Sequence, residues 1–82
     1  MGVAQMKPRD VLIDARGLKC PLPVLKLEKA LAGVQAGDRV IVLATDPVAK
    51  IDIPLYCQQQ GHDLAIDEAD DGAMRFTVVK SG

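Results

Sequence analysis

A single cysteine stands in an unusual setting in the stretch Leu18 to Pro23, "LKCPLP". It is followed at once by a proline, and the next residues, "VLKLEKALAG", have the apolar period of a helix. The first N–H groups of a helix lack internal partners and, with the peptide dipoles, form a positive end. A thiolate is stabilised there, which lowers the pKa of the thiol. We therefore predict that Cys20 is the N-cap of a helix and a reactive nucleophile.

The two prolines are expected to shape this site. Pro21 fits the first helical position, where a missing N–H is harmless and the fixed φ starts the helix. Pro23 removes a second donor, so the N–H groups of Leu22 and Val24 are expected to face the sulfur or an atom bound to it. Lys19 adds a neighbouring positive charge. A purely structural cysteine would more naturally lie within the apolar face of the helix.

Several kinds of thiol chemistry fit the spacing poorly. Thioredoxin-type exchange needs a second cysteine three residues on, where this chain has Pro23. A Cys-His hydrolase needs a base, and the sequence does not place the only histidine, His62, near Cys20. Zinc needs three or four ligands, and Cys20, Cys57 and His62 are too few and wrongly spaced. A thiolate that accepts and donates a group without an internal base fits best, and a persulfide is such a group.

The apolar pattern predicts a domain of class α+β with the order β-α-β-α-β-β. Asp71-Gly72 marks a hairpin between the last two strands. We expect a two-layer α/β sandwich, in which two helices cover one face of a four-stranded mixed sheet and the other, polar face meets solvent. Residues 1–10 are expected to be a flexible tail, and residues 11–82 a single domain. The predicted elements are strands at 11–15, 40–44, 63–69 and 73–80 and helices at 21–32 and 47–60.

The second helix is expected to consist of two pieces. Asp46 precedes Pro47 and fits the N-cap of a first turn near Pro47–Ile51. Pro54 interrupts the pattern. A second piece is therefore predicted from Asp52, as its N-cap, to Gln60.

Composition excludes some classes of function. The 82 residues carry a net charge of −1 and include one Phe, one Tyr and no Trp. Wholesale phosphate binding and stacking on nucleobases are therefore disfavoured, and no nucleic-acid partner is expected. No secretory signal or membrane span is visible, which favours the cytoplasm and reduced thiols. The charge is uneven, since residues 1–39 are basic and residues 40–82 are acidic.

Two motifs carry a resemblance to a known family. The pattern "LDxxGxxCPxP" appears from Ile13 to Pro23, and a second signature runs from Asp46-Pro47 through Asp52-Ile53-Pro54 and Cys57 to Gly61-His62. The chain resembles the TusA sulfur carriers, also called SirA-like or YedF-like. The resemblance implies the same two-layer fold and a persulfide on Cys20, in a site shaped by Gly17, Lys19, Pro21, Pro23 and Asp14.

The resemblance also implies the partners. The sulfur donor would be a cysteine desulfurase or a rhodanese, and the acceptor a TusD-like or DsrE-like protein. The pathways served by such relatives are 2-thiouridine formation in tRNA, molybdenum cofactor supply, sulfur oxidation and selenium metabolism. No cofactor and no metal are implied, and we expect a monomer. Leu22 replaces an acidic residue and Ile51 a basic one, which weakens the tRNA-specific assignment and leaves the carrier assignment intact.

Other polar residues have two interpretations each. Arg16, Lys19 and Lys26 form either a basic collar for a partner or ordinary solvated surface, and Asp52 is a further candidate for partner binding. Asp14 is expected to hydrogen-bond the turn before Cys20 or to pair with Arg16. His62 is expected to make a loop hydrogen bond. Cys57 is expected to pack in the core. The alternative is a thiol redox-sensing or regulatory module, in which Cys57 forms a disulfide with Cys20.

Overall fold

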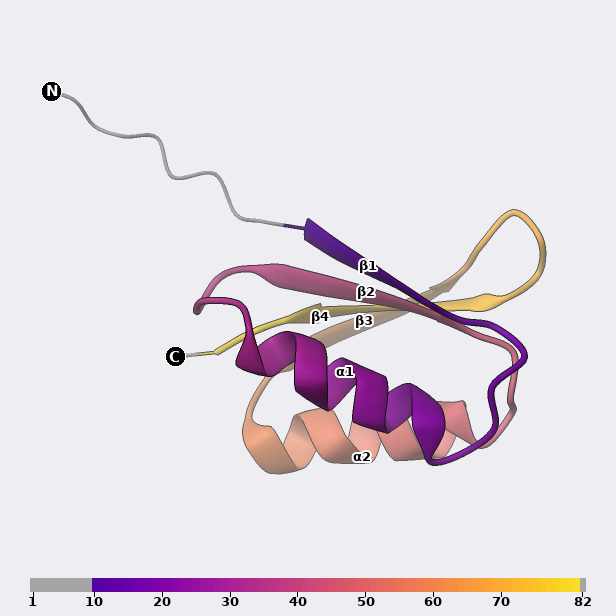
Figure 1. Cartoon of the computed structure of the whole chain (residues 1–82), viewed down its shortest axis with the longest axis horizontal. Coiled ribbons are helices and arrows are strands. Elements are labelled where there is room, and N and C mark those ends of the chain that lie inside the picture. The colour runs from indigo at the N-terminus through magenta and orange to yellow at the C-terminus, as the bar shows by residue number, and fades with distance from the viewer. Residues whose placement is uncertain (1–9, 82) are drawn as a thin grey trace, which may run out of the picture.

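A computed structural model describes residues 10–81 and contains the six predicted elements in the predicted order (Figure 1). Each strand and helix begins and ends within two residues of its predicted limits. The elements are β1 (Asp10–Ala15), α1 (Leu22–Ala32), β2 (Arg39–Ala44), α2 (Ala49–Gln60), β3 (Asp63–Glu68) and β4 (Met74–Val79).

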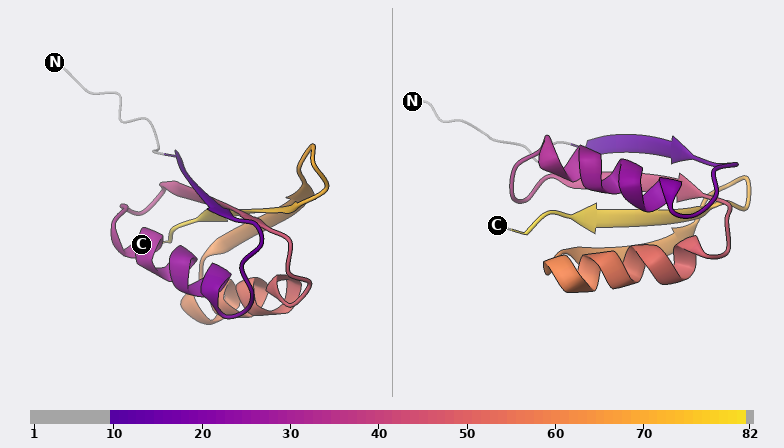
Figure 2. Two further views of the ribbon diagram at one scale, coloured as in Figure 1. Left: turned by 45° about the vertical axis from the view of Figure 1, so that its right-hand side comes forward. Right: turned by 60° about the horizontal axis from the view of Figure 1, so that its bottom comes forward.

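The four strands form one mixed sheet in the order β1-β2-β4-β3. β1 and β2 are parallel, whereas β4 is antiparallel to both β2 and β3. Both helices lie side by side on one face of the sheet (Figure 2). The predicted α+β two-layer fold is therefore confirmed. β1, β2 and β3 all end at the same edge of the sheet, so the loops that follow them are neighbours in space.

Alternation along the central strands builds the core. Val40, Val42 and Ala44 point from β2 toward the helices, and Phe76 and Val78 point the same way from β4. All five side chains are fully buried. The helices cover them with apolar residues at helical spacing, namely Leu27 and Leu31 from α1 and Ala49, Ile53 and Cys57 from α2.

The predicted break in the second helix is wrong. α2 is one helix from Ala49 to Gln60 that contains Pro54, and Asp52 lies in its first turn instead of capping a second piece. Pro54 is the sixth residue of α2, and it removes one backbone hydrogen bond, the one that its N–H would make to the carbonyl oxygen of Lys50. Burial of Ile53 and Cys57 in the core holds the helix across this position. Gly61 ends α2 in the left-handed conformation, with φ at 77°.

The boundary predicted for the tail also needs correction. Asp10 is the first residue of β1, where it is in register with Arg39 of β2. The two side chains form an ion pair with a Nη2 to Oδ2 distance of 2.8 Å. The rest of the predicted tail, residues 1–9, lies outside the described part of the chain.

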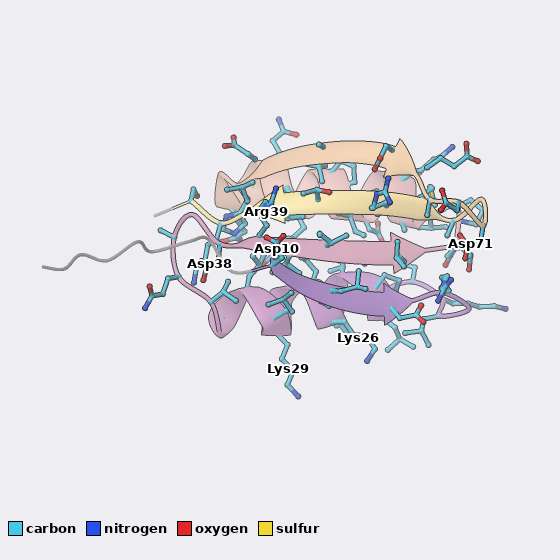
Figure 3. The ribbon with its side chains drawn as sticks, turned by 90° about the horizontal axis from the view of Figure 1, so that it is seen from above. Asp10, Lys26, Lys29, Asp38, Arg39 and Asp71 are labelled. Atoms are coloured by element: carbon cyan, nitrogen blue, oxygen red, sulfur yellow. The ribbon has the colours of Figure 1, made fainter. Side chains whose placement is uncertain are left out.

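The helix-free face of the sheet is less polar than predicted. It carries Leu12 of the edge strand β1, which is 64% exposed, together with the half-buried Ile41 and Leu43 of the central strand β2. Charged residues lie toward its ends, where Figure 3 shows Asp10 beside Arg39 at one end and Asp71 at the other. The alternation in β1 and β2 places apolar residues on both faces, so burial of one face does not make the other polar.

Candidate functional site

Cys20 lies in the loop between β1 and α1. Because β1 and β2 are parallel, this loop meets the loop between β2 and α2 at one edge of the sheet (Figure 1). The side chain of Cys20 is exposed, and its thiol is free. The edge thus brings together residues of both sequence motifs, which are separated by more than twenty positions in the chain.

The start of α1 differs from the prediction by one residue. Pro21 is the N-cap, Pro23 is the second helical residue, and Cys20 precedes the cap, joined to Pro21 by a cis peptide bond. The N–H of Leu22 donates to the carbonyl oxygen of Lys19 at 2.9 Å. This N–H is therefore engaged in a local turn, and it does not serve the sulfur as predicted.

Asp46 fixes the backbone at Cys20. Its Oδ2 accepts the N–H of Cys20 at 2.7 Å, and its Oδ1 accepts the N–H of Val48 at 3.1 Å. Asp46 thereby ties together the entrances of both helices. Its bond to the N–H of Val48 is the one predicted for the cap of a turn that starts at Pro47, and its carbonyl oxygen accepts the N–H of Ala49 at 3.0 Å, although α2 itself begins after Val48. The sequence marked Asp46 only as a helix cap, since local spacing does not show that its carboxylate reaches Cys20.

A second contact between the two loops involves Gly17 and Thr45. The N–H of Gly17 donates to Oγ1 of Thr45 at 2.9 Å. Gly17 has a φ of 80°, a conformation that residues with a Cβ rarely adopt. Gly17 was expected to support the site. It forms a sharp turn, and its hydrogen bond to Thr45 holds this turn against the β2–α2 loop. No sequence signal identified Thr45.

The thiol of Cys20 donates a hydrogen bond to Oδ2 of Asp52, in the first turn of α2. This hydrogen bond is the largest of the effects that raise the pKa of Cys20 above its ordinary value. Loss of hydration and the negative charges of Asp52 and Asp46 raise it further. The predicted lowering of the pKa is therefore wrong. The carboxylate of Asp52 contacts the sulfur directly, and the negative charges of Asp52 and Asp46, both from the second motif, act in the same direction.

Asp14 and Arg16 form the predicted pair. Nε and the backbone N–H of Arg16 both donate to Oδ1 of Asp14, at 2.8 Å and 3.1 Å. These hydrogen bonds lower the pKa of Asp14 to about 2. Arg16 also pairs with Asp71 in the β3–β4 hairpin. Its guanidinium thus bridges two carboxylates at the surface, and its side chain remains 43% exposed.

The three basic residues of the predicted collar do not gather around the thiol. Lys26 lines a groove between α1 and β1 together with Lys29, and both point away from the sheet edge in Figure 3. Lys19 is exposed next to Cys20 and contributes positive charge at Asp46. Of the three, only Lys19 has both proximity to the thiol and a charge that is not held in an ion pair of the described residues.

Large apolar side chains are exposed on both sides of Cys20 and Asp52. Leu22 follows the cysteine by two residues, and Ile51, which is 66% exposed, precedes Asp52. These are the two positions where the chain departs from the expected family pattern. We call the whole set the apolar rim: Leu22 and Leu25 of α1, and Val48, Ile51 and Leu55 at the start and on the outer side of α2.

The remaining candidate residues lie elsewhere. Cys57 is 1% exposed and packs in the core, as predicted, and burial raises the pKa of its thiol. Both cysteines are free. Nδ1 of His62 accepts the N–H of Ser81 at 3.1 Å, which confirms a loop hydrogen bond. Within residues 10–81, no three His, Cys, Asp or Glu side chains are arranged to hold a metal ion.

Comparison with known proteins gives a consistent result. The family model described as sulfurtransferase TusA matches residues 11–80. The sulfur carrier protein TusA of Pseudomonas putida is 38% identical over 71 residues, which cover 87% of this chain and 89% of that protein. A relative from Neisseria meningitidis, whose name describes it provisionally as a sulfur carrier protein, is 49% identical over 67 residues, or 82% of this chain and 88% of its own.

A solved structure shares the fold. The crystal structure of a SirA-like protein from Desulfitobacterium hafniense superposes with a TM-score of 0.79 at 32% sequence identity. The match covers 88% of this chain and 99% of that one.

Proposed function

This chain belongs to the sulfurtransferase TusA family, and on that basis we propose that it is a sulfur carrier that holds sulfane sulfur as a persulfide on Cys20. The observation that carries the proposal is the position of this thiol. It is exposed, yet its backbone is anchored by Asp46 and its sulfur by Asp52. A carrier needs such a thiol, because the sulfur must enter the active sites of other proteins in a defined orientation.

The apolar rim supports the same proposal. Exposed leucine, isoleucine and valine side chains flank Cys20 from both helices. Apolar surface of this kind favours protein–protein contact, and it excludes water once a partner is docked. Exclusion of water protects a persulfide during transfer. In this proposal Gly17, Pro21 and Pro23 shape the loop that carries Cys20, and Lys19 is the cation next to the cysteine.

The proposed partners follow from the family. The donor is a cysteine desulfurase or a rhodanese, and the acceptor is a TusD-like or DsrE-like protein. Leu22 and Ile51 make the rim more apolar than the pattern of tRNA-thiolation members, so an acceptor in molybdenum cofactor supply or sulfur oxidation is favoured. We place the carrier in the cytoplasm as a monomer. Neither helix within residues 10–81 is long and apolar enough to cross a membrane.

The proposal is tested by intact mass spectrometry after incubation with a cysteine desulfurase and cysteine, or with a rhodanese and thiosulfate. The wild type is expected to gain one sulfur atom that a reductant removes. Cys20→Ser is expected to gain none, because it lacks the acceptor thiol. The matched variant Cys57→Ser should load like the wild type, since Cys57 is buried. Loading of Cys20→Ser, or no loading of the wild type by either donor, would contradict the proposal.

The alternative redox function has less support. It requires a disulfide between Cys20 and Cys57, but Cys57 faces the core beside Ile53 and is closed to solvent, whereas Cys20 is exposed at the sheet edge. Formation of the disulfide would need α2 to turn or unfold locally.

A further inference from the structure

The contact between Cys20 and Asp52 raises a chemical question that the carrier function leaves open. A thiol that must become a nucleophile is usually placed beside a positive charge. Here the thiol donates a hydrogen bond to the carboxylate of Asp52 in α2, and a second carboxylate, that of Asp46, accepts the backbone N–H of Cys20. Lys19, whose positive charge acts on Asp46, is the basic residue next to Cys20 in the chain. The hydrogen bond places a proton between the sulfur and the carboxylate of Asp52, where either group can hold it during transfer.

The two carboxylates are not equivalent. Both oxygens of Asp46 are occupied, since each accepts a backbone N–H. Among the described residues, the only hydrogen-bond donor that reaches the carboxylate of Asp52 is the thiol of Cys20. Asp52 is therefore the group that is free to accept this proton and to release it again.

We propose that Asp52 is a catalytic residue, which carries a proton between the inner and the outer sulfur of the persulfide each time sulfur is transferred. This inference rests on the proposed carrier function. Asp46 is the positioning residue in the same scheme, because it fixes the backbone of Cys20 next to Asp52.

The proton balance explains the need for such a group. In unloading, an acceptor thiolate attacks the outer sulfur of Cys20–S–SH. A new S–S bond forms to the acceptor, the S–S bond to Cys20 breaks, and Cys20 keeps its electron pair. The proton of the outer sulfur passes to Asp52 and from Asp52 to the sulfur of Cys20. The products are the acceptor persulfide anion and the Cys20 thiol, and loading from a donor persulfide anion is the same step in reverse.

The carboxylate also affects the reactivity of the loaded form. A negative charge beside an ionisable group disfavours its anionic form. Asp52 thereby keeps the persulfide protonated, and a neutral outer sulfur is a better target for an attacking thiolate than an anionic one. The feature that makes Cys20 a weak free nucleophile thus makes its persulfide easier to unload.

The first measurement is the pH dependence of alkylation of the free thiol by iodoacetamide. Asp52→Asn removes the charge and keeps the size of the side chain, so the alkylation profile is expected to move to lower pH. For each unit by which the pKa falls, the thiolate fraction near pH 7 rises about tenfold. Alkylation should accelerate by roughly threefold, because a less basic thiolate is a weaker nucleophile. The matched control is Asp63→Asn, an exposed aspartate at the start of β3, whose profile should equal that of the wild type.

The second measurement is unloading. Protein loaded with inorganic polysulfide, without a partner protein, is mixed with cyanide, and thiocyanate is followed in a single turnover. Asp52→Asn is expected to release sulfur about 10- to 100-fold more slowly than the wild type. As the pH is raised, unloading of this variant should begin to slow at a lower pH than unloading of the wild type. The reason is that its persulfide ionises more readily. Asp52→Glu, which keeps a carboxylate, should recover part of the rate, and thermal melting establishes that each variant is folded.

The combination of results separates this role from a structural one. Faster alkylation together with slower unloading supports the proposal, since a loosened loop would not change the two rates in opposite directions. Unchanged pH profiles in Asp52→Asn, or no rescue by Asp52→Glu, would overturn it while leaving the carrier function intact. If the wild type takes up no sulfur from polysulfide or from donor proteins, the proposed function fails and the transfer role of Asp52 fails with it.

Discussion

Two carboxylates contact Cys20, the residue proposed to carry sulfur. The thiol of Cys20 contacts Asp52, and its backbone N–H contacts Asp46. Asp46 accepts hydrogen bonds from the backbone N–H groups of Cys20 and Val48, and both bonds lower its pKa. The bond from Cys20 has the larger effect. Asp46 therefore stays ionised and bound to both loops near neutral pH, so the position of Cys20 depends on a residue of the other motif.

Replacement of Asp46 tests this dependence. Asp46→Ala removes the acceptor for the N–H groups of Cys20 and Val48. The loop is then expected to hold the sulfur less rigidly, and loading by a donor protein should slow by about 10- to 100-fold. Alkylation by a small reagent should not slow, because it needs no fixed orientation.

The control for this measurement is Asp70→Asn, an exposed aspartate of the β3–β4 hairpin. It should load at the rate of the wild type. Equal loading of Asp46→Ala and wild type would show that the hydrogen bond to Cys20 does not position the thiol for transfer.

The two helices have separate inner and outer apolar surfaces. In α1, Leu27 and Leu31 face the sheet, whereas Leu22 and Leu25 face solvent. In α2, Ile53 and Cys57 are buried, whereas Ile51 and Leu55 are exposed. The inner set builds the core, and the outer set belongs to the apolar rim, so stability and partner binding depend on different side chains of the same helices.

A pair of leucines in α1 tests this division. Leu27 is fully buried and Leu25 is 49% exposed. Leu27→Ala is expected to lower the free energy of unfolding by about 2 to 5 kcal/mol, because it removes buried contacts and leaves a cavity. Leu25→Ala should change it by only about 0.5 kcal/mol, as is usual for surface positions. Denaturation in urea measures both, and equal losses would be incompatible with the inner and outer faces assigned to α1.

At the scale of the whole molecule, exposed apolar residues occur on two opposite surfaces. The apolar rim borders Cys20 on the helical side, and Leu12 lies on the helix-free face of the sheet, in the edge strand β1. Only the rim adjoins the reactive thiol. The proposed docking of sulfur donors and acceptors therefore involves the sheet edge and the helix entrances, and it leaves the open face of the sheet free.

Charge substitutions on these two surfaces distinguish them. Ile51→Asp is expected to weaken loading by a cysteine desulfurase about tenfold, since it places a charge in a contact that must lose water. Loading by inorganic polysulfide should be unaffected, because it needs no protein contact. Leu12→Asp, at a residue that is 64% exposed, is the control and should load normally with both. A larger loss in Leu12→Asp than in Ile51→Asp would place the docking surface on the sheet instead.

The sequence alone determined the order of elements, the fold class, the family and the identity of the candidate thiol. These follow from local information, since apolar period, turn residues and motif spacing act over a few positions. Cys57 in the core and the pair of Asp14 with Arg16 were predictable for the same reason. The continuity of α2 through Pro54 was not, because burial of Ile53 and Cys57 against the sheet outweighs the local preference of a proline.

The environment of Cys20 was decided only by the tertiary structure. Local reasoning placed the thiol at a positive helix end beside Lys19 and predicted a lowered pKa. The parallel pairing of β1 with β2 brings the second motif to the same sheet edge, and with it Asp46 and Asp52. Electrostatic effects depend on distance in space rather than in sequence, so two carboxylates 26 and 32 residues away raise the pKa of the thiol instead.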